Sequence, residues 1–406
     1  MTRVLLVCPE PLGHGQPAGV GVRFIEMAGV LLADGHAVTV LSADGGAVAG
    51  CRTGNLEPES MRDSSVVADV AVVQGHAANA FFAHGRVIPT VIDLYDPFII
   101  ENLHYYATRG AEVYTHDHAT LTRSLMRGDV FLCASAAQRL FYLGLLLAVG
   151  RLNPVAFETD SHLGGLLRLA PFGVQPARPA RSRPTNAILF GGIYDWYDPI
   201  TAIDAAAIAR KSIPDITLTF TRHPNPDSTP QGKAAEAMEH VRRRGHDQFI
   251  RFEPWVPYEQ RGEFFERHAL AMICFPQSIE TDLSMRTRVY DFLWGGLPVI
   301  TSPAPGTDEI LLRYGTGAVV RDGSAETFAA AIVSILSDRD RLQEMSQGTT
   351  RFVRDHQWPL VLEPLREFCR NPAFEKSKEA FAVELETPAR TESILDRLRR
   401  RIGGAS

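Results

Sequence analysis

The sequence predicts an α/β fold made of two successive alternations of strands and helices, each with a parallel sheet. Apolar runs such as RVLLVC at residues 3–8 and AILFG at residues 187–191 are typical of parallel strands that are buried on both faces. Amphipathic helical stretches separate these runs, as they do in βαβ units. A segment rich in proline and arginine, QPARPARSRP at residues 175–184, divides the first alternation from the second and indicates a linker.

Length and composition fit an ordinary globular protein of two domains. The 406 residues include 45% hydrophobic and 22% charged residues. The formal net charge of −6 gives no indication of a nucleic-acid partner. Five scattered cysteines without C-x-x-C spacing argue against a disulfide framework or a zinc site. The longest apolar run, residues 140–149, is too short to span a bilayer, and residues 1–8 look like a strand and not a leader, so we expect a cytoplasmic protein.

The first alternation begins with the strand at residues 3–8 and a glycine-rich loop at residues 13–21. This loop follows the carboxyl end of a parallel strand, which is where open α/β sheets bind ligands. Gly19 and Gly21 could bring backbone N–H groups close to a substrate or a phosphate, and His14 and Arg23 could face the same space. The alternative for His14 is an exposed loop residue. Further strands are expected at residues 37–41, 66–73, 87–94 and 130–134, and helices at residues 20–33, 75–83, 101–126 and 138–149.

The strand at residues 87–94 ends in polar residues. Asp93, Tyr95 and Asp96 lie at this end, and such groups suit the polarisation or orientation of a substrate. We expect Asp93 in this role and Asp96 as the cap of a helix that begins at Pro97. The alternating His116 and His118 cannot face one side of a helix together, so a zinc site there is not expected.

The second alternation places polar or aromatic residues at the ends of four strands, as a binding crevice requires. Strands are expected at residues 187–191, 216–220, 249–252, 269–275 and 299–301, and helices at residues 199–210, 285–294, 325–336, 339–354 and 358–369. Residues 371–406 are polar and charged, with a basic helix near residues 394–402.

The most informative stretch is residues 280–300, ETDLSMRTRVYDFLWGGLPVI. Ser284 is placed to cap the helix at residues 285–294, and Arg286 and Arg288 stand in its first turn. Cations are unfavourable at that end of a helix dipole, but an anion held between the two arginines would explain them. Asp291 offers a carboxylate suited to a ribose. The simpler alternative is a solvated surface on which Asp291 pairs with Arg288.

The glycine-rich loop, LLADGHAVTVLSA at residues 31–43, FGG at 190–192 and DFLWGGLPVITSPAPGTDEIL at 291–311 together resemble a retaining GT-B glycosyltransferase of the GT4-like (group 1) family. The resemblance covers roughly residues 3–370, and residues 280–309 are its most specific part. It implies two Rossmann-like domains that face each other across a cleft. The expected parts are an acceptor-side domain (1–175), a linker (176–184), a nucleotide-sugar domain (185–357), a crossover helix that packs back on the first domain (358–370) and an appendage with a short helical tail (371–406).

By this resemblance the substrates are a nucleoside-diphosphate sugar and a small-molecule or glycan acceptor, with no cofactor and no metal. The catalytic residues that we expect are Asp93, Arg288 and His14. The expected donor-binding residues are Gly19, Gly21, Gly192, Arg222, Trp255, Val256, Ser284, Met285, Arg286, Arg288 and Asp291. The expected contacts to the acceptor or the sugar are Tyr95, Asp195, Glu280 and Asp282.

The sequence departs from the family pattern of two glutamates separated by seven residues. Asp291 replaces the second glutamate and Leu283 the first, while Glu280 and Asp282 are out of register. The sequence therefore does not identify the acidic residue that contacts the sugar. It also does not identify the sugar, the base of the donor, the acceptor or the oligomeric state. A non-hydrolysing nucleotide-sugar epimerase, a pseudo- or N-glycosyltransferase that forms a C–N bond, and a nucleotide-sugar sensor are the alternatives.

Overall fold

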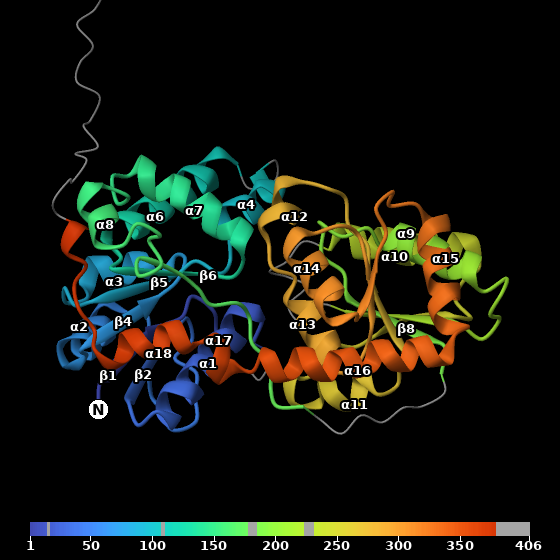
Figure 1. Cartoon of the computed structure of the whole chain (residues 1–406), viewed down its shortest axis with the longest axis horizontal. Helices are drawn as coiled ribbons and strands as arrows, with labels where there is room; N and C mark the ends of the chain where they lie inside the picture. Colours follow the sequence, from blue (N-terminus) through green and yellow to red (C-terminus); the bar gives the residue numbers. More distant parts are fainter. Residues whose placement is uncertain (14–16, 107–109, 178–184, 223–230, 379–406) are drawn as a thin grey trace, which may run out of the picture.

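The computed structural model describes residues 1–13, 17–106, 110–177, 185–222 and 231–378. It confirms the α/β class, because these residues form two lobes, each built on a parallel sheet with helices against it (Figure 1). The basic helix expected near residues 394–402 lies outside the described residues, as do His14 and most of the linker.

The N-terminal lobe contains a seven-stranded sheet in the order β3-β2-β1-β4-β5-β6-β7. Its strands are β1 (Arg3–Val7), β2 (Ala37–Ser42), β3 (Arg52–Asn55), β4 (Val70–Val73), β5 (Thr90–Asp93), β6 (Val130–Cys133) and β7 (Leu167–Leu169). Its helices are α1 (Gly19–Ala33), α2 (Pro58–Val67), α3 (Ala77–His84), α4 (Phe98–Glu101), η1 (Asn102–Tyr105), α6 (Ala111–Arg127), α7 (Ala136–Ala148) and α8 (Pro154–Thr159). Strands β4 and β6 are apolar throughout because both faces of the sheet are covered.

The C-terminal lobe repeats this plan with a six-stranded sheet in the order β10-β9-β8-β11-β12-β13. Its strands are β8 (Ala187–Gly192), β9 (Thr217–Thr221), β10 (Ile250–Glu253), β11 (Leu270–Ile273), β12 (Val299–Thr301) and β13 (Gly317–Val319). Its helices are α9 (Pro199–Ala209), α10 (Gly232–Arg244), η2 (Tyr258–Gln260), α11 (Arg261–Phe265), α12 (Ile279–Leu283), α13 (Thr287–Trp294), α14 (Pro305–Tyr314), α15 (Ala325–Leu336) and α16 (Arg339–Asp355).

Some elements differ from those that the sequence predicts. Residues 66–67 end helix α2 and do not open a strand, because the sheet begins only at Val70. Residues 305–314 form helix α14, which the sequence did not predict. Pro305 lies in its first turn, where the missing N–H of proline removes no hydrogen bond within the helix. The expected single helix at residues 285–294 is preceded by a second, shorter helix, α12, and α13 itself begins at Thr287.

The two connections between the lobes run side by side. Val174 on the outgoing chain forms a parallel bridge with Gln357 on the returning chain, and the Val174 N–H donates to the carbonyl of His356 (2.8 Å). Helices α17 (Trp358–Val361) and α18 (Glu363–Arg370) then lie on the N-terminal lobe, below its sheet in Figure 1. There Arg366 binds both carboxylate oxygens of Asp34 at 2.7 Å.

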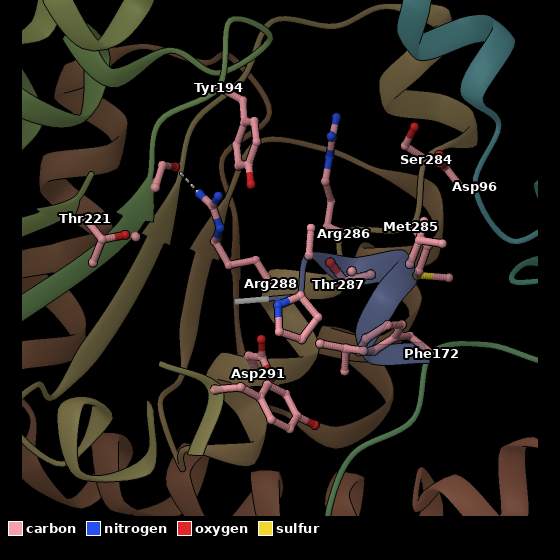
Figure 2. Close-up of a pocket in the computed structure, with 18 of the residues that line it drawn as sticks. Asp96, Phe172, Tyr194, Thr221, Ser284, Met285, Arg286, Thr287, Arg288 and Asp291 are labelled. Carbon is pink, nitrogen blue, oxygen red and sulfur yellow. Dashed lines mark hydrogen bonds between the residues drawn. The ribbon is translucent and has the colours of Figure 1, made fainter. Parts of the chain in front are cut away.

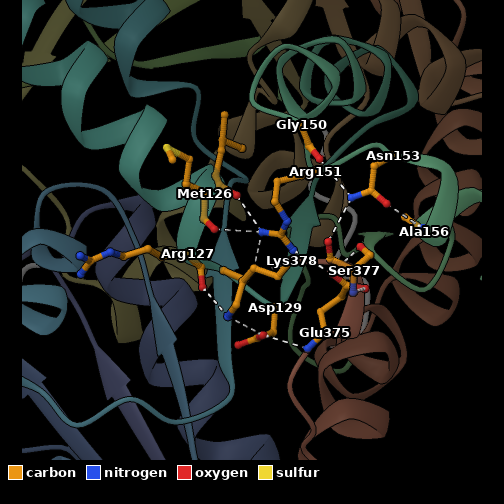
Figure 3. A network of polar contacts seen from close by, with 12 residues as sticks. Met126, Arg127, Asp129, Gly150, Arg151, Asn153, Ala156, Glu375, Ser377 and Lys378 are labelled. Carbon is orange, nitrogen blue, oxygen red and sulfur yellow. Dashed lines mark hydrogen bonds and ion pairs between the residues drawn. The ribbon is translucent and has the colours of Figure 1, made fainter. Parts of the chain in front are cut away.

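A buried polar network fixes residues 375–378 to the N-terminal lobe (Figure 3). Asp129 accepts hydrogen bonds from the N–H of Glu375 (2.9 Å) and from Lys378 Nζ (2.7 Å). Arg151, which is 2% exposed, donates to the carbonyls of Leu125 and Gly128 and pairs with Glu375. Asp129 and Arg151 therefore each gain a partner that lies more than 200 positions away in the chain. In the described part of the chain, no helix is long and apolar enough to cross a membrane.

Candidate functional site

A cavity of about 920 Å³ lies between the two lobes at the carboxyl ends of their strands. From the N-terminal lobe it is lined by the loop after β1, the start of α1 and the loop after β5. From the C-terminal lobe it is lined by the ends of β8, β9 and β10 and by α13. The predicted site residues that line it are Gly19, Tyr95, Gly192, Trp255, Val256, Ser284, Met285, Arg286, Arg288 and Asp291.

Arg288 is held at the centre of the C-terminal wall. Its Nη1 donates to the carbonyl of Gly192 (2.5 Å), and its guanidinium lies 4.7 Å from the ring centroid of Tyr197. Figure 2 shows Arg288 reaching toward Tyr194 and Thr221, while Asp96 and Ser284 lie on the opposite side of the view. Gly191 has a φ of +83°, which a side chain would strain, and Arg288 packs against it. The half-buried guanidinium is therefore oriented and still open to the cavity.

Arg286 has a carboxylate partner that the sequence did not indicate. Both terminal nitrogens of Arg286 bind the carboxylate of Glu280, at 2.8 and 2.6 Å, and each residue is at most 4% exposed. The charge of Arg286 is thereby already neutralised. Glu280 is likewise engaged and does not line the cavity, so its predicted contact with the sugar is wrong. Both arginines line the cavity, and of the two the described residues show an ion pair for Arg286 alone.

Ser284 does not cap helix α13, contrary to the expectation from the sequence. Its hydroxyl donates to Glu101 of the other lobe (3.2 Å), and Arg286 occupies the N-cap position of α13 without a side-chain cap. The amino end of α13 faces the cavity at Thr287 and Arg288, both of which line it. A helix end of this kind favours a negatively charged ligand.

Asp291 pairs with Arg261 and not with Arg288. Nε of Arg261 donates to Asp291 (3.1 Å), and the Arg261 guanidinium lies between the rings of Tyr258 (3.5 Å) and Trp294 (4.3 Å). Burial raises the pKa of Asp291, and Arg261 and then Arg288 oppose this effect. One third of the Asp291 side chain is exposed, and the residue lines the cavity, so a ligand hydroxyl can still reach it.

The N-terminal wall brings Glu10, Gly19 and Tyr95 together. The carboxylate of Glu10 accepts the N–H of Gly21 (2.8 Å), which places Gly21 behind the wall and not in it. A Cβ on Gly19 would lie 2.8 Å from the hydroxyl oxygen of Tyr95, so any larger residue there would require Tyr95 to shift. Gly19 also lies near Thr287 of the other lobe.

Asp96 and Glu101 form a carboxyl pair on the same wall. They share a hydrogen bond, and both line the cavity. Burial raises the pKa of Asp96 well above its usual value, and Glu101 and Glu10 raise it further. The expected cap at Asp96 is wrong, because Pro97 occupies the N-cap of α4 and Asp96 faces the ligand space. The two carboxylates at the end of β5, Asp93 and Asp96, indicated a polar site in the sequence. Nothing in the sequence indicated that Glu101 folds back beside Asp96.

We predict that Asp96→Asn becomes more stable relative to the wild type as pH rises. The folded protein binds the Asp96 proton more tightly than the unfolded chain, so ionisation above the ordinary pKa of 3.8 costs folding free energy. Asparagine cannot ionise and avoids this cost. Glu101, Glu10 and the Asp93–Arg23 pair are the nearest charged groups and are unchanged in the variant.

The measurement is urea unfolding of both proteins at about pH 5 and about pH 8. The exposed Asp63→Asn on α2 is the matched control. If the Asp96→Asn and wild-type stabilities change in parallel with pH, the Asp96 carboxyl is not destabilised as an anion.

Asp93, which the sequence predicts to be catalytic, lies in the buried interior and forms an ion pair there. Its carboxylate pairs with Arg23 of α1 (2.7 and 3.0 Å), and both side chains are fully buried. Arg23 also donates to the carbonyls of Ala170 and Pro171. This buried pair lies behind the wall and does not line the cavity.

Three further predicted residues lie away from the cavity. Asp195 accepts the N–H of Lys233 at the start of α10 (3.1 Å). Arg222 is exposed, as is Asp282 on α12. The residues that the sequence interpretation missed include Glu10, Glu101, Tyr194, Tyr197, Thr221, Tyr258 and Arg261. The motif IYDWYDP at the end of β8 carries Tyr194 and Tyr197, so its aromatic residues were a better signal than its acids.

Residues 293–352 match the family model described as "Glycosyl transferases group 1". HepE from Anabaena, solved with UDP-glucose, is similar with a TM-score of 0.66 and 13% identity over 91% of this chain and 100% of that chain. Sucrose-phosphate synthase from Thermosynechococcus elongatus has a TM-score of 0.63 and 13% identity over 91% and 98% of the two chains. WaaG, a glycosyltransferase involved in lipopolysaccharide biosynthesis, has a TM-score of 0.59 and 13% identity over 90% and 98%. No curated protein sequence matches the chain.

At these identities the solved structures show the fold, which is GT-B. The family match covers the segment that begins in α13, beside the cavity, and continues through α16. The GT-B fold that the resemblance implies is thereby confirmed, and residues 293–352 of the chain are similar to glycosyltransferases of group 1, the family that the sequence resembles.

Proposed function

We propose that this protein transfers a sugar, with retention of configuration, from a nucleoside-diphosphate donor to a small-molecule or glycan acceptor. One observation carries the proposal. The cavity between the lobes presents Arg288 and the amino end of α13 on one wall, and the carboxyl groups of Glu10, Asp96 and Glu101 on the other. The first wall suits a diphosphate and the second suits a polar acceptor.

The chemistry that these residues support is stabilisation of the leaving group. When the bond between the sugar and the diphosphate breaks, negative charge grows on the phosphate oxygens. The guanidinium of Arg288 is already fixed by Gly192, so it can stabilise this charge without reorganising. We propose that this wall supplies enough positive charge for the reaction to run without a metal ion, in which case a chelator leaves the rate unchanged.

The acceptor wall would orient the attacking hydroxyl. Asp96 and Glu101 face the cavity from the N-terminal lobe, and a protonated carboxyl and a carboxylate together can donate to and accept from one hydroxyl group. Asp291 would hold the ribose, and Trp255 and Val256 would flank the base. In this arrangement the leaving diphosphate itself takes the acceptor proton.

Thermal unfolding in the presence of UDP, GDP, ADP and dTDP tests this proposal. HepE was solved with UDP-glucose, so UDP is the first nucleotide to measure. A nucleotide present at 100 times its dissociation constant stabilises the folded state by about 2.7 kcal/mol, which raises the melting temperature measurably. We expect one of the four to do so. If none shifts the melting temperature at millimolar concentration, the proposed donor site is wrong.

Product analysis separates transfer from the alternatives. With donor and acceptor, the proposal expects a new glycoside of unchanged anomeric configuration. An epimerised nucleotide sugar formed from the donor alone would instead indicate an epimerase.

A further inference from the structure

We propose that Gln138 is a positioning residue that closes the cleft, because its carboxamide joins the acceptor wall to the donor-binding segment. The hydrogen bonds of Gln138 to the two lobes do not depend on the proposed function. Only the activity measurement below rests on the proposed function, and a second measurement does not.

Gln138 is a fully buried polar residue whose partners come from both lobes. Its Nε2 donates to the carbonyl of Tyr95 (2.8 Å) and to the carbonyl of Leu283 (2.9 Å). Its Oε1 accepts the N–H of Ala134 (2.7 Å). The two carbonyls require the amide nitrogen on one side and the N–H requires the oxygen on the other, so the orientation of the carboxamide is fixed by its partners.

The two carbonyls belong to the two walls of the cavity. Tyr95 directly precedes Asp96 on the acceptor side, and Leu283 directly precedes residues 284–288 on the donor side. Gln138 stands in the first turn of α7, and its own N–H donates to the Ser135 cap, so its backbone is held rigidly. One side chain therefore sets the separation between the acceptor loop and the segment that carries Arg288.

The hydrogen bonds of Gln138 lie at the edge of the cleft that is opposite the connection between the lobes. The lobes are connected where α16 passes to α17, at the bottom centre of Figure 1, and Val174 and Gln357 pair there. Gln138 acts at the opposite edge, where α12 lies against α7 and α4. A rotation about the connected edge would separate Leu283 from Tyr95, so the hydrogen bond from Gln138 to Leu283 opposes opening of the cleft at a distance from that edge. The bond from Ser284 to Glu101 lies beside it.

Gln138→Glu is the most informative variant. Glutamate has the same shape and can still accept the N–H of Ala134, but a carboxylate cannot donate to two carbonyls and repels both. We expect kcat to fall about 10²-fold, because a small displacement of reacting groups has an effect of this size. We expect the dissociation constant of the nucleoside diphosphate to change little, since most of its predicted contacts lie in the C-terminal lobe. Activity should recover partly at low pH, where the protonated side chain donates one hydrogen bond.

Small-angle X-ray scattering provides the measurement that does not depend on activity. Without nucleotide, Gln138→Glu should have a larger radius of gyration than the wild type. Gln277→Glu makes the same chemical change at an exposed glutamine whose bond to Pro303 stays within one lobe, and it should match the wild type in both measurements. Gln138→Met gives the same comparison if Gln138→Glu does not fold.

The outcomes are distinct. If the Gln138 variants keep both the wild-type kcat and the wild-type scattering profile, the proposal is wrong. A drop in kcat with equal loss of nucleotide binding and a lower melting temperature would indicate general destabilisation and would also overturn it. If the wild type shows no transfer, the proposed function fails, and the scattering comparison alone decides on Gln138.

Discussion

Arg288→Ala is expected to lower kcat by about 10² to 10³-fold, the effect of removing one preorganised donor to a developing negative charge. Arg288 is held by the carbonyls of Gly192 and Phe190 and faces the cavity, while the neighbouring Arg286 is neutralised by Glu280. No second cation of this segment can therefore replace it. Steady-state kinetics with the donor identified by thermal unfolding would give kcat and KM separately.

The controls for this prediction separate charge from geometry. Arg288→Lys keeps the charge but loses the planar fork that lies over Tyr197, so it should fall between alanine and the wild type. Arg321→Ala removes an exposed arginine from the same lobe and should leave kcat unchanged. If Arg288→Ala retains the wild-type kcat, Arg288 does not stabilise the leaving group.

Asp93→Ala is expected to lower the free energy of unfolding by about 3–5 kcal/mol, because it leaves the fully buried guanidinium of Arg23 without its carboxylate. The expected effect is on stability, although the sequence suggested catalysis. Urea unfolding followed by circular dichroism would measure it.

A double variant tests the cause of that loss. Arg23→Met with Asp93→Leu removes both charges and should recover much of the stability, since apolar residues of similar volume can replace a buried ion pair. The double variant should also keep most of the wild-type kcat, because neither residue lines the cavity. A loss of activity in the folded double variant would restore Asp93 as a catalytic candidate.

The fold was predictable because its signals are local. Runs such as RVLLV and VFLC are buried on both faces, and such runs separated by amphipathic helices define parallel sheets without knowledge of distant contacts. Short elements were missed where proline and glycine looked like loops, as at α14. The position of Arg288 in the cavity wall was also predictable, because a cation at the start of a helix needs an explanation.

The rest of the site depends on partners that are distant in sequence. Arg286 and Arg288 look equivalent in the chain, but only the fold brings the carboxylate of Glu280 onto Arg286. Asp93 and Asp96 are three residues apart, and the deciding contact is Arg23, seventy positions earlier. Arg261 reaches Asp291 across thirty residues. Hydrophobic periodicity indicates which face of a helix or strand is buried, but it does not indicate which charged side chain from another element contacts that face.

The network around Asp129 and Arg151 has a consequence for how the protein is synthesised. The ribosome completes residues 1–175 well before residues 375–378, which supply Lys378 and Glu375 to these two buried charges. Until then the first lobe to emerge holds an acid and a base that have only their partners within that lobe, the N–H of Thr90 for Asp129 and the carbonyls of Leu125 and Gly128 for Arg151. The last contacts of the N-terminal lobe therefore form only after the whole C-terminal lobe has been translated.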